Sequence, residues 1–184
     1  MSRAPAPGAG EGELLCAFQA VARVMVAVTA RSLARLDSDV TLSQYRALVS
    51  LVSLGPQRTS DLAQELGVAT STATRLADRL VGKGLVVRTQ RRDDLRATWI
   101  GLTCDGKALL GQAMKLRRAE IRALLRSLPT GERNGRGVTT VLNAFAEVAN
   151  EPTEEDWWNR WQRCDQSASS HESLVDPQRG KALR

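Results

Sequence analysis

Two short amphipathic helix patterns, hinged at one glycine, occupy residues 59–87. In the first pattern, one face carries Leu62, Ala63 and Leu66, and Gly67 then supplies the left-handed turn that reverses the chain. The second pattern repeats its apolar residues with a period of about 3.6, at Ala73, Leu76, Ala77, Leu80 and Val81. Helices joined this tightly pack at a sharp angle, so the segment predicts a helix-turn-helix.

The face of the second helix that points away from its apolar stripe carries hydroxyl and guanidinium groups. It comprises Ser71, Arg75 and Arg79, with Thr72 and Lys83 on its flank. The candidate DNA-binding residues of this helix are Thr70, Ser71, Thr72, Thr74, Arg75 and Arg79. Such a face suits the major groove of DNA, where hydroxyls meet phosphates or base edges and arginine bonds guanine O6 and N7. Exposed helix faces are polar in most proteins, however, so the helix pair by itself is equally compatible with a solvated surface.

A basic β-hairpin is predicted directly after the helix pair. Residues 86–92 form the first strand, residues 93–95 the turn, and residues 96–102 the second strand. Its cations are Arg88, Arg91, Arg92 and Arg96. A charged hairpin next to a recognition helix is typical of a wing, which inserts arginine into the neighbouring minor groove. The hairpin therefore favours double-stranded DNA as the partner.

The most specific motifs lie in the wing and just after it, at Asp94-Leu95-Arg96-Ala97 and Leu102-Thr103-Cys104-Asp105-Gly106. With these motifs and residues 41–55 and 59–86, the chain from Leu14 to Val148 resembles the MarR family of bacterial transcriptional regulators. The resemblance implies a mainly α fold with a small β-hairpin wing. In this fold, a winged helix-turn-helix is flanked by N- and C-terminal dimerisation helices.

The resemblance also assigns roles to single residues. It implies that Asp94 braces an arginine and that Arg96 enters the minor groove. Two positions depart from the family pattern. Leu95 stands where an arginine is common, and Ala69 stands where a serine usually caps the second helix. We therefore expect Thr70 or Thr72 to cap that helix instead.

The chain divides into three parts. Residues 1–12 are rich in Ala, Pro and Gly and are predicted to be a disordered tail. Residues 13–150 form the MarR-type domain, with the winged-helix core at 41–103. Residues 151–184 form a tryptophan-containing extension that we expect to be partly disordered.

Both flanks of the winged-helix core are expected to be helical and apolar. A long helical pattern runs over residues 13–36, a second helix capped by Thr103 runs to about Leu128, and a third apolar stripe ends near Val148. In the family, the first and last helices interlock two subunits. The resemblance thus implies a homodimer whose recognition helices lie roughly 34 Å apart, so the expected target is an inverted-repeat operator.

The extension has two interpretations. A short helix capped by Thr153 would place Trp157, Trp161 and Cys164 on one side. This side either packs against the helical base of the dimer or forms a lid for a partner or ligand, since exposed aromatic patches mark binding sites.

Composition agrees with DNA as the partner and argues against an enzyme. The net charge is +6. The excess of positive charge is largest in residues 70–100, which contain seven arginines and lysines but only three aspartates. The only histidine, His171, lies in the polar tail, the three cysteines are scattered, and no glycine-rich phosphate loop occurs. We therefore expect no catalytic residues, no cofactor and no metal.

The location is predicted from the absence of targeting and spanning segments. No run approaches the roughly 18 apolar residues that cross a bilayer, and no secretory leader is recognisable. These observations predict a cytoplasmic protein with free thiols and no membrane partner.

The function that these patterns favour is sequence-specific DNA binding as a transcriptional regulator, which represses or activates by occupying its operator; repression is the expected role. The resemblance adds a small-molecule effector that releases DNA, and Tyr45 and Arg46 are the candidate polar contacts. Two alternatives stay open, a hydroperoxide-responsive regulator using Cys16 and a winged-helix protein-interaction module. Cys16 lies one residue from the family's sensing position, so we expect it to be a small buried apolar residue.

Overall fold

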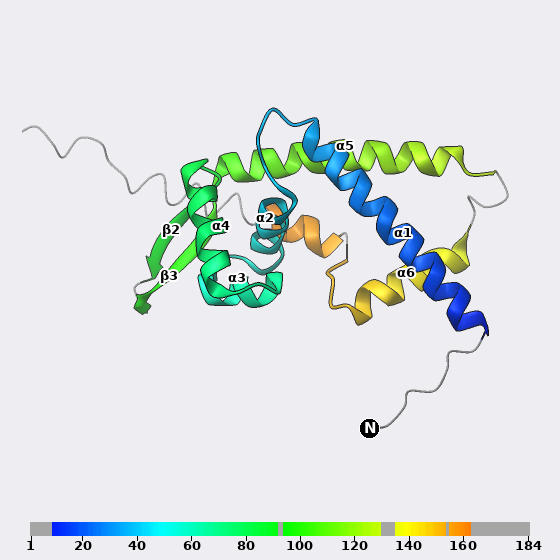
Figure 1. Ribbon diagram of the computed structural model, residues 1–184, viewed down its shortest axis with the longest axis horizontal. Helices are drawn as coiled ribbons and strands as arrows, with labels where there is room; N and C mark the ends of the chain where they lie inside the picture. Colours follow the sequence, from blue (N-terminus) through cyan, green and yellow to red (C-terminus); the bar gives the residue numbers. More distant parts are fainter. Residues whose placement is uncertain (1–8, 92–93, 130–134, 154, 163–184) are drawn as a thin grey trace, which may run out of the picture.

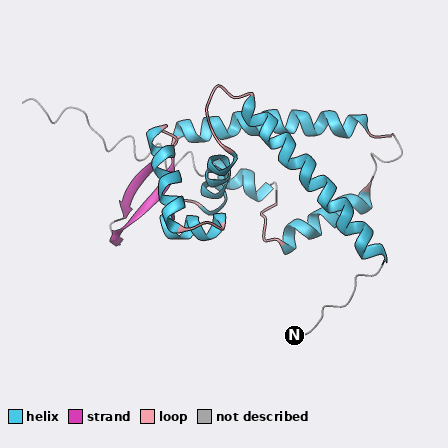
Figure 2. Cartoon of the chain, in the orientation of Figure 1, coloured by secondary structure: helices cyan, strands magenta, loops and turns pink. Residues whose placement is uncertain are grey.

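The helix-turn-helix and the sheet lie at one end of the long helix at residues 104–127, and the first helix, at residues 9–34, runs from this helix to the last one, at residues 136–148 (Figure 1). The computed structural model describes residues 9–91, 94–129, 135–153 and 155–162. In chain order the elements are α1 (Ala9–Ala34), α2 (Leu42–Leu54), β1 (Gln57–Arg58), α3 (Thr59–Leu66), α4 (Thr70–Gly82), β2 (Val86–Arg91), β3 (Asp94–Leu102), α5 (Cys104–Ser127) and α6 (Arg136–Val148). A further short helix covers residues 155–162. Figure 2 shows a mainly helical fold with one small sheet, which confirms the predicted fold class.

Local sequence explains where several helices begin and end. Thr41 starts α2 with a capping box, in which its hydroxyl accepts from the N–H of Gln44 and the Gln44 side chain accepts from the N–H of Thr41. Gly67 ends α3 in the left-handed conformation at φ 65°, as the sequence predicted. Thr103 caps α5 by accepting from the N–H of Gly106.

The sheet has three antiparallel strands in the order β1-β3-β2. β1 was not predicted, because two residues carry no alternation pattern, but Gln57 pairs with Ile100 and Arg58 with Trp99. The hairpin also differs from the prediction in its turn. β3 begins at Asp94, so this residue belongs to a strand and pairs with Arg91 across an irregularity in the register. The wing is therefore longer and its loop shorter than expected.

One predicted boundary is corrected, at the N-terminal flank. α1 begins at Ala9, so residues 9–12, which composition placed in a disordered tail, are helical. The helix of the apolar repeat extends towards the N-terminus by about one more turn, which contains Gly10 and Gly12. The last helix, for which the sequence analysis gave only an end near Val148, begins at Arg136 and ends at Val148.

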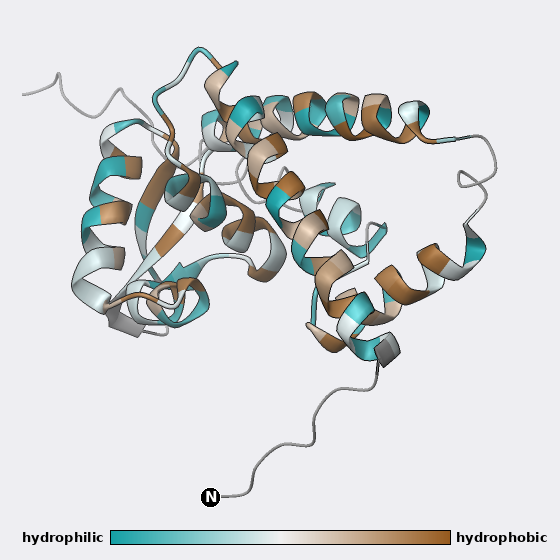
Figure 3. Cartoon of the chain, turned by 45° about the vertical axis from the view of Figure 1, so that its right-hand side comes forward, coloured by the Kyte–Doolittle hydropathy of each residue, from teal (hydrophilic) through white to brown (hydrophobic). Residues whose placement is uncertain are grey.

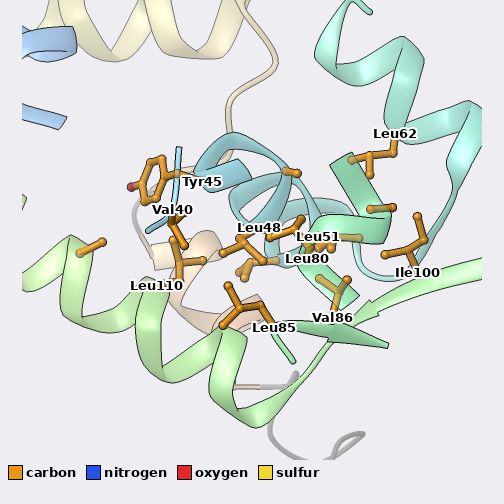
Figure 4. Close-up of a cluster of buried hydrophobic side chains, with 14 of the residues drawn as sticks. Val40, Tyr45, Leu48, Leu51, Leu62, Leu80, Leu85, Val86, Ile100 and Leu110 are labelled. Carbon is orange, nitrogen blue, oxygen red and sulfur yellow. The ribbon is translucent and has the colours of Figure 1, made fainter. Parts of the chain in front are cut away.

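The winged unit is held by one apolar core in which α2 is central (Figure 4). Its fully buried large side chains come from five elements and include Leu48, Leu51, Leu62, Leu80, Ile100 and Leu110. Leu80 and Leu62 come from the helix-turn-helix, Ile100 from the middle strand, and Leu110 from α5. The core thus fixes α4 and the wing relative to α5.

Outside the winged unit, α1 and α6 expose much of their apolar surface (Figure 3). Phe18 and Phe145 join the two helices with their ring centroids 4.5 Å apart. Even so, exposed apolar side chains remain on both helices and on the second half of α5. They include Leu14, Leu15, Val21, Val24, Leu124, Leu125, Val138, Leu142, Phe145 and Val148.

One helix in the described part of the chain, Gly10–Ala34, is long and apolar enough to cross a membrane by length and composition alone. The sequence-based statement that no run approaches this length is therefore corrected. That statement considered only uninterrupted runs of apolar residues, whereas this helix is apolar on average and contains Arg23 and Arg31. The same helix contacts α5, where Val28 is fully buried and Arg31 pairs with Glu120, so the test is weak evidence for a membrane.

Candidate nucleic-acid interface

Helix α4 buries one face and exposes the other. Ala73, Ala77 and Leu80 are completely buried against α3 and the core. The opposite face is exposed and carries Thr70, Ser71, Thr72, Arg75 and Arg79, with Thr74 half-buried at its edge. The structure thus brings together the six residues predicted for the recognition helix on one accessible side, with both guanidinium groups on exposed positions.

The start of α4 differs from the prediction. Its N-cap residue is Ala69, and no side chain makes the cap hydrogen bond, so neither Thr70 nor Thr72 caps the helix. Thr70 and Thr72 both lie inside the helix, after its N-cap residue. The Thr74 hydroxyl donates to the carbonyl of Thr70 at 2.8 Å, and Arg75 Nε donates to the carbonyl of Ser71 at 3.4 Å. Because no side chain caps α4, the N–H groups of its first turn receive no side-chain acceptor at this exposed helix end.

Arg88 connects the wing to the recognition helix. Its guanidinium lies 2.7 Å from a carboxylate oxygen of Asp78 on α4, and both side chains are partly exposed. The sequence analysis treated Arg88 only as a DNA contact and did not use Asp78. An exposed ion pair contributes little to stability, so this contact shows that β2 lies against α4 but adds little to holding it there.

The remaining wing residues are described only in part. Arg91, Asp94 and Arg96 lie in β2 and β3, but their side chains fall outside the described part of the structure. Arg92 lies outside the described residues altogether. Their roles at the DNA therefore stay predictions.

Lys83 ties the end of α4 to the start of α2. Its ammonium donates to the carbonyl of Asp39 and to the side-chain oxygen of Gln44, the latter at 3.3 Å. Gln44 is the residue that completes the capping box of α2. Sequence reasoning missed this contact, because the residues lie 39 and 44 positions apart and no local pattern relates them.

The wing returns to α5 through the Leu-Thr-x-x-Gly motif. The Thr103 hydroxyl donates to the carbonyl of Gly84 at 2.6 Å, and its N–H donates to the carbonyl of Leu85 at 3.2 Å. Gly84 itself has φ 69°, which favours glycine. Gly106 lies so close to Leu85 that an added Cβ would sit 2.0 Å from the Leu85 carbonyl oxygen. The motif therefore fixes the end of the recognition helix against α5.

Tyr45 and Arg46, the candidate effector contacts, do not share a surface. Tyr45 is buried in the core next to Val40 and Leu110 (Figure 4), whereas Arg46 is exposed. Burial raises the pKa of the Tyr45 phenol, and the nearby charge of Arg117 opposes part of this rise. The structure therefore gives Tyr45 a place in the core and does not bring the two side chains together.

We expect the free energy of unfolding to fall in alkaline solution, because the buried Tyr45 phenol then ionises. Because its pKa is higher in the folded protein than in the unfolded chain, the neutral phenol stabilises the fold fully below the unfolded pKa of about 10. This contribution is lost as the pH rises through the folded pKa. Tyr45 is the only tyrosine of the chain, so phenolate absorbance reports it alone. Tyr45→Phe should flatten the decline, and an unchanged decline would contradict this explanation.

The cysteines that the structure describes are free and exposed. Cys16 lies on α1 and Cys104 at the start of α5, and Cys164 lies outside the described residues. The expectation that Cys16 is buried is wrong for the single chain, because it lies on the part of α1 whose apolar neighbours are also exposed. Within the described residues, no group of three or more His, Cys, Asp or Glu side chains could hold a metal.

A sharply angled helix pair, a basic hairpin formed by β2 and β3, and a capped helix that follows the hairpin define a winged helix-turn-helix protein. Comparison with known proteins agrees, since the model of the MarR family matches residues 40–98. The chain belongs to the MarR family of transcriptional regulators. The expectation that the protein is not an enzyme is confirmed by the family, whose members are transcriptional regulators.

Three known proteins illustrate the similarity. The crystal structure of RV1404 from Mycobacterium tuberculosis shares 33% identity with a TM-score of 0.72, covering 81% of this chain and 99% of that one. The HTH-type transcriptional repressor MdtR of Bacillus subtilis is 34% identical over 80 residues, which are 44% of this chain and 52% of that protein. The multiple antibiotic resistance protein MarR of Salmonella typhimurium is 34% identical over 74 residues, 40% of this chain and 51% of that protein. The chain thus spans about half the length of these two curated relatives.

Proposed function

We propose that this protein is a sequence-specific DNA-binding transcriptional regulator. In this proposal it is located in the cytoplasm and acts as a repressor. The observation that carries the proposal is the exposed face of α4, where Ser71, Arg75 and Arg79 stand opposite the buried Ala73, Ala77 and Leu80. A helix anchored this firmly presents its outer side chains in a fixed arrangement, as reading of base edges requires. The wing arginines Arg88, Arg91, Arg92 and Arg96 add contacts to the adjacent groove, and Asp94 braces one arginine of the wing.

The proposed active form is a homodimer on an inverted-repeat operator. The apolar side chains that α1, α6 and the end of α5 expose are more extensive than scattered surface residues of a monomer. A second copy would cover them through the same surface, since a two-fold interface is self-complementary. Two recognition helices related by this axis would read half-sites roughly 34 Å apart.

Selection of bound sequences from a random duplex pool tests the proposal most directly. We expect enrichment of an inverted repeat whose half-sites lie about one helical turn apart, because the dimer axis imposes its symmetry on the DNA. A protein that retains no duplex in preference to scrambled DNA at physiological salt would overturn the proposal. Retention of an unpaired half-site would overturn its dimeric part.

The salt dependence of binding separates DNA recognition from a winged-helix module that acts through protein contacts. Each phosphate that a cation neutralises releases counterions, so the logarithm of affinity should fall linearly with the logarithm of salt concentration, by about 0.9 per contact. We expect a slope that reports several contacts, measured by fluorescence anisotropy on the selected duplex. A flat dependence would favour the protein-interaction module, whose basic face is only solvated.

Release of DNA by a small molecule is part of the proposal, and it does not rest on Tyr45 and Arg46, which the structure separates. Redox control through Cys16 is the second candidate, and the exposure of its thiol favours testing it. If organic hydroperoxide releases wild-type protein from the operator but not Cys16→Ser, then Cys16 is the sensor. Release that persists in Cys16→Ser would exclude the mechanism.

A further inference from the structure

The short helix at residues 155–162 lies beyond the segment that resembles the family and joins α2 to α5. Figure 1 draws it in orange beside α2. Trp157 is buried in the core, and Trp158 and Trp161 pack against it. The three indole rings contact one another, with centroids between 5.3 and 5.9 Å apart. Thr153 caps the helix by accepting from the N–H of Asp156 at 3.1 Å.

On α5, this helix has a site shaped for one indole. A Cβ at Gly111 would stand 3.2 Å from the ring of Trp161, so the glycine leaves just enough space for the ring. The Lys107 ammonium lies 5.2 Å from the centroid of the same ring, within cation–π range, and the Lys107 side chain is buried. Trp161 is therefore held on α5 by both shape and charge.

On α2, the contact is a hydrogen bond to the last turn. Arg160 Nη1 donates to the carbonyl of Ser53. The chain then turns at Gly55, with φ 78°, and enters β1. Gln57 of β1 donates back to the carbonyl and hydroxyl oxygens of Ser50, at 3.2 and 2.8 Å. Fixing the end of α2 thus fixes β1, which pairs with β3 and leads directly into α3.

Helix α5 also contacts the apolar helix α1. It packs against α1 as well as α2, and Glu120 on α5 pairs with Arg31 on α1. The angle between α2 and α5 therefore relates the DNA-facing unit to the surface proposed for dimerisation. We propose that Arg160 and Trp161 are positioning residues that hold this angle and so set the half-site spacing that the dimer accepts. The inference rests on the proposed function.

The test measures spacing preference in the full-length protein. Duplexes carry the selected inverted repeat with half-site centres about 10 base pairs apart, or one to two base pairs closer or farther. We expect wild-type protein to prefer one spacing by about tenfold or more, as each mismatch in a specific site typically costs at least that order. Arg160→Ala and Trp161→Ala should reduce the preference to about threefold or less, because the recognition helices can then adopt several separations.

Two further variants control the result. Asn159→Ala changes an exposed residue of the same helix and should keep the wild-type preference. Arg160→Lys keeps a donor for the Ser53 carbonyl and should restore most of it. Affinities are expressed per folded dimer. If Trp161→Ala does not fold, the spacing preference of Arg160→Ala tests the inference.

Each outcome bears on a different claim. Variants that lose thermal stability yet retain the wild-type spacing preference would show that the tryptophan helix only packs, and would overturn the inference alone. Wild-type protein that binds the selected repeat at every spacing equally would also overturn the inference alone. Wild-type protein that prefers none of these duplexes to scrambled DNA would overturn the proposed function, and this inference with it.

Discussion

Gly106→Ala is expected to lower the free energy of unfolding by about 3 kcal/mol or more, at the upper end of what overpacking costs. The added methyl would lie 2.0 Å from the carbonyl oxygen of Leu85, a backbone atom that no rotamer change can move away. That oxygen also accepts the N–H of Thr103 at 3.2 Å. To relieve the overlap, the start of α5 and the end of α4 must move apart, which disturbs the hydrogen bonds of Thr103 as well.

Thermal unfolding followed by circular dichroism measures this loss. For a protein of this size, about 3 kcal/mol corresponds to a decrease in melting temperature of roughly 6–12 °C. Gly82→Ala is the matched control, because a Cβ there meets nothing within 4 Å and the residue ends α4. We expect the control to be neutral or slightly stabilising. Equal melting temperatures for the two variants would show that the junction yields without cost.

The sequence predicted the parts of this fold that depend on local patterns. The stripe at Ala73, Ala77 and Leu80 gave α4 its correct buried face, since burial follows the helical period directly. Gly67 and Thr103 were recognised because a left-handed turn and a helix cap each need particular residue types at one position. The same reasoning failed at Ala69, where the helix begins without any side-chain cap.

The contacts missed by sequence reasoning join residues far apart in the chain. Lys83 bonds Gln44, Arg160 bonds Ser53, and β1 pairs with β3, none of which leaves a periodic signal. Asp78 and Arg88 are ten residues apart, but their pairing depends on how the hairpin folds back over α4. Sequence reasoning therefore predicted which residues form the exposed face of α4, whereas the contacts that orient this face required the structure.

A similar limit applies to Tyr45 and Arg46. They are adjacent in sequence and were taken together as polar candidates, yet consecutive positions on a helix lie about 100° apart. Tyr45 points into the core and Arg46 does not. A helical period across residues 42–54 puts Tyr45 on the same side as Leu48 and Val52, which are also buried, so the sequence contained this separation although the prediction did not use it.

Arg75→Ala is expected to weaken binding to the selected operator by about 1–3 kcal/mol, because a bidentate contact to guanine contributes that much to discrimination. Arg75 is exposed on α4, and its Nε donates to the Ser71 carbonyl at 3.4 Å, which holds the guanidinium along the face that we propose enters the groove. The loss corresponds to about a 5- to 150-fold rise in Kd. Stability should change little, because the side chain is outside the core.

Two controls distinguish base reading from general charge. Arg118→Ala removes the same charge from an exposed position of α5 and should leave the Kd within about twofold, since charges beyond a Debye length are screened. Arg75→Lys keeps the charge but not the planar pair of donors. If Arg75 reads a base, the lysine variant should remain weak on the selected operator while its affinity for scrambled duplex is unchanged. A lysine variant with full operator affinity would show that Arg75 contacts only phosphate, and specificity would then lie with Arg79, Ser71 and the wing.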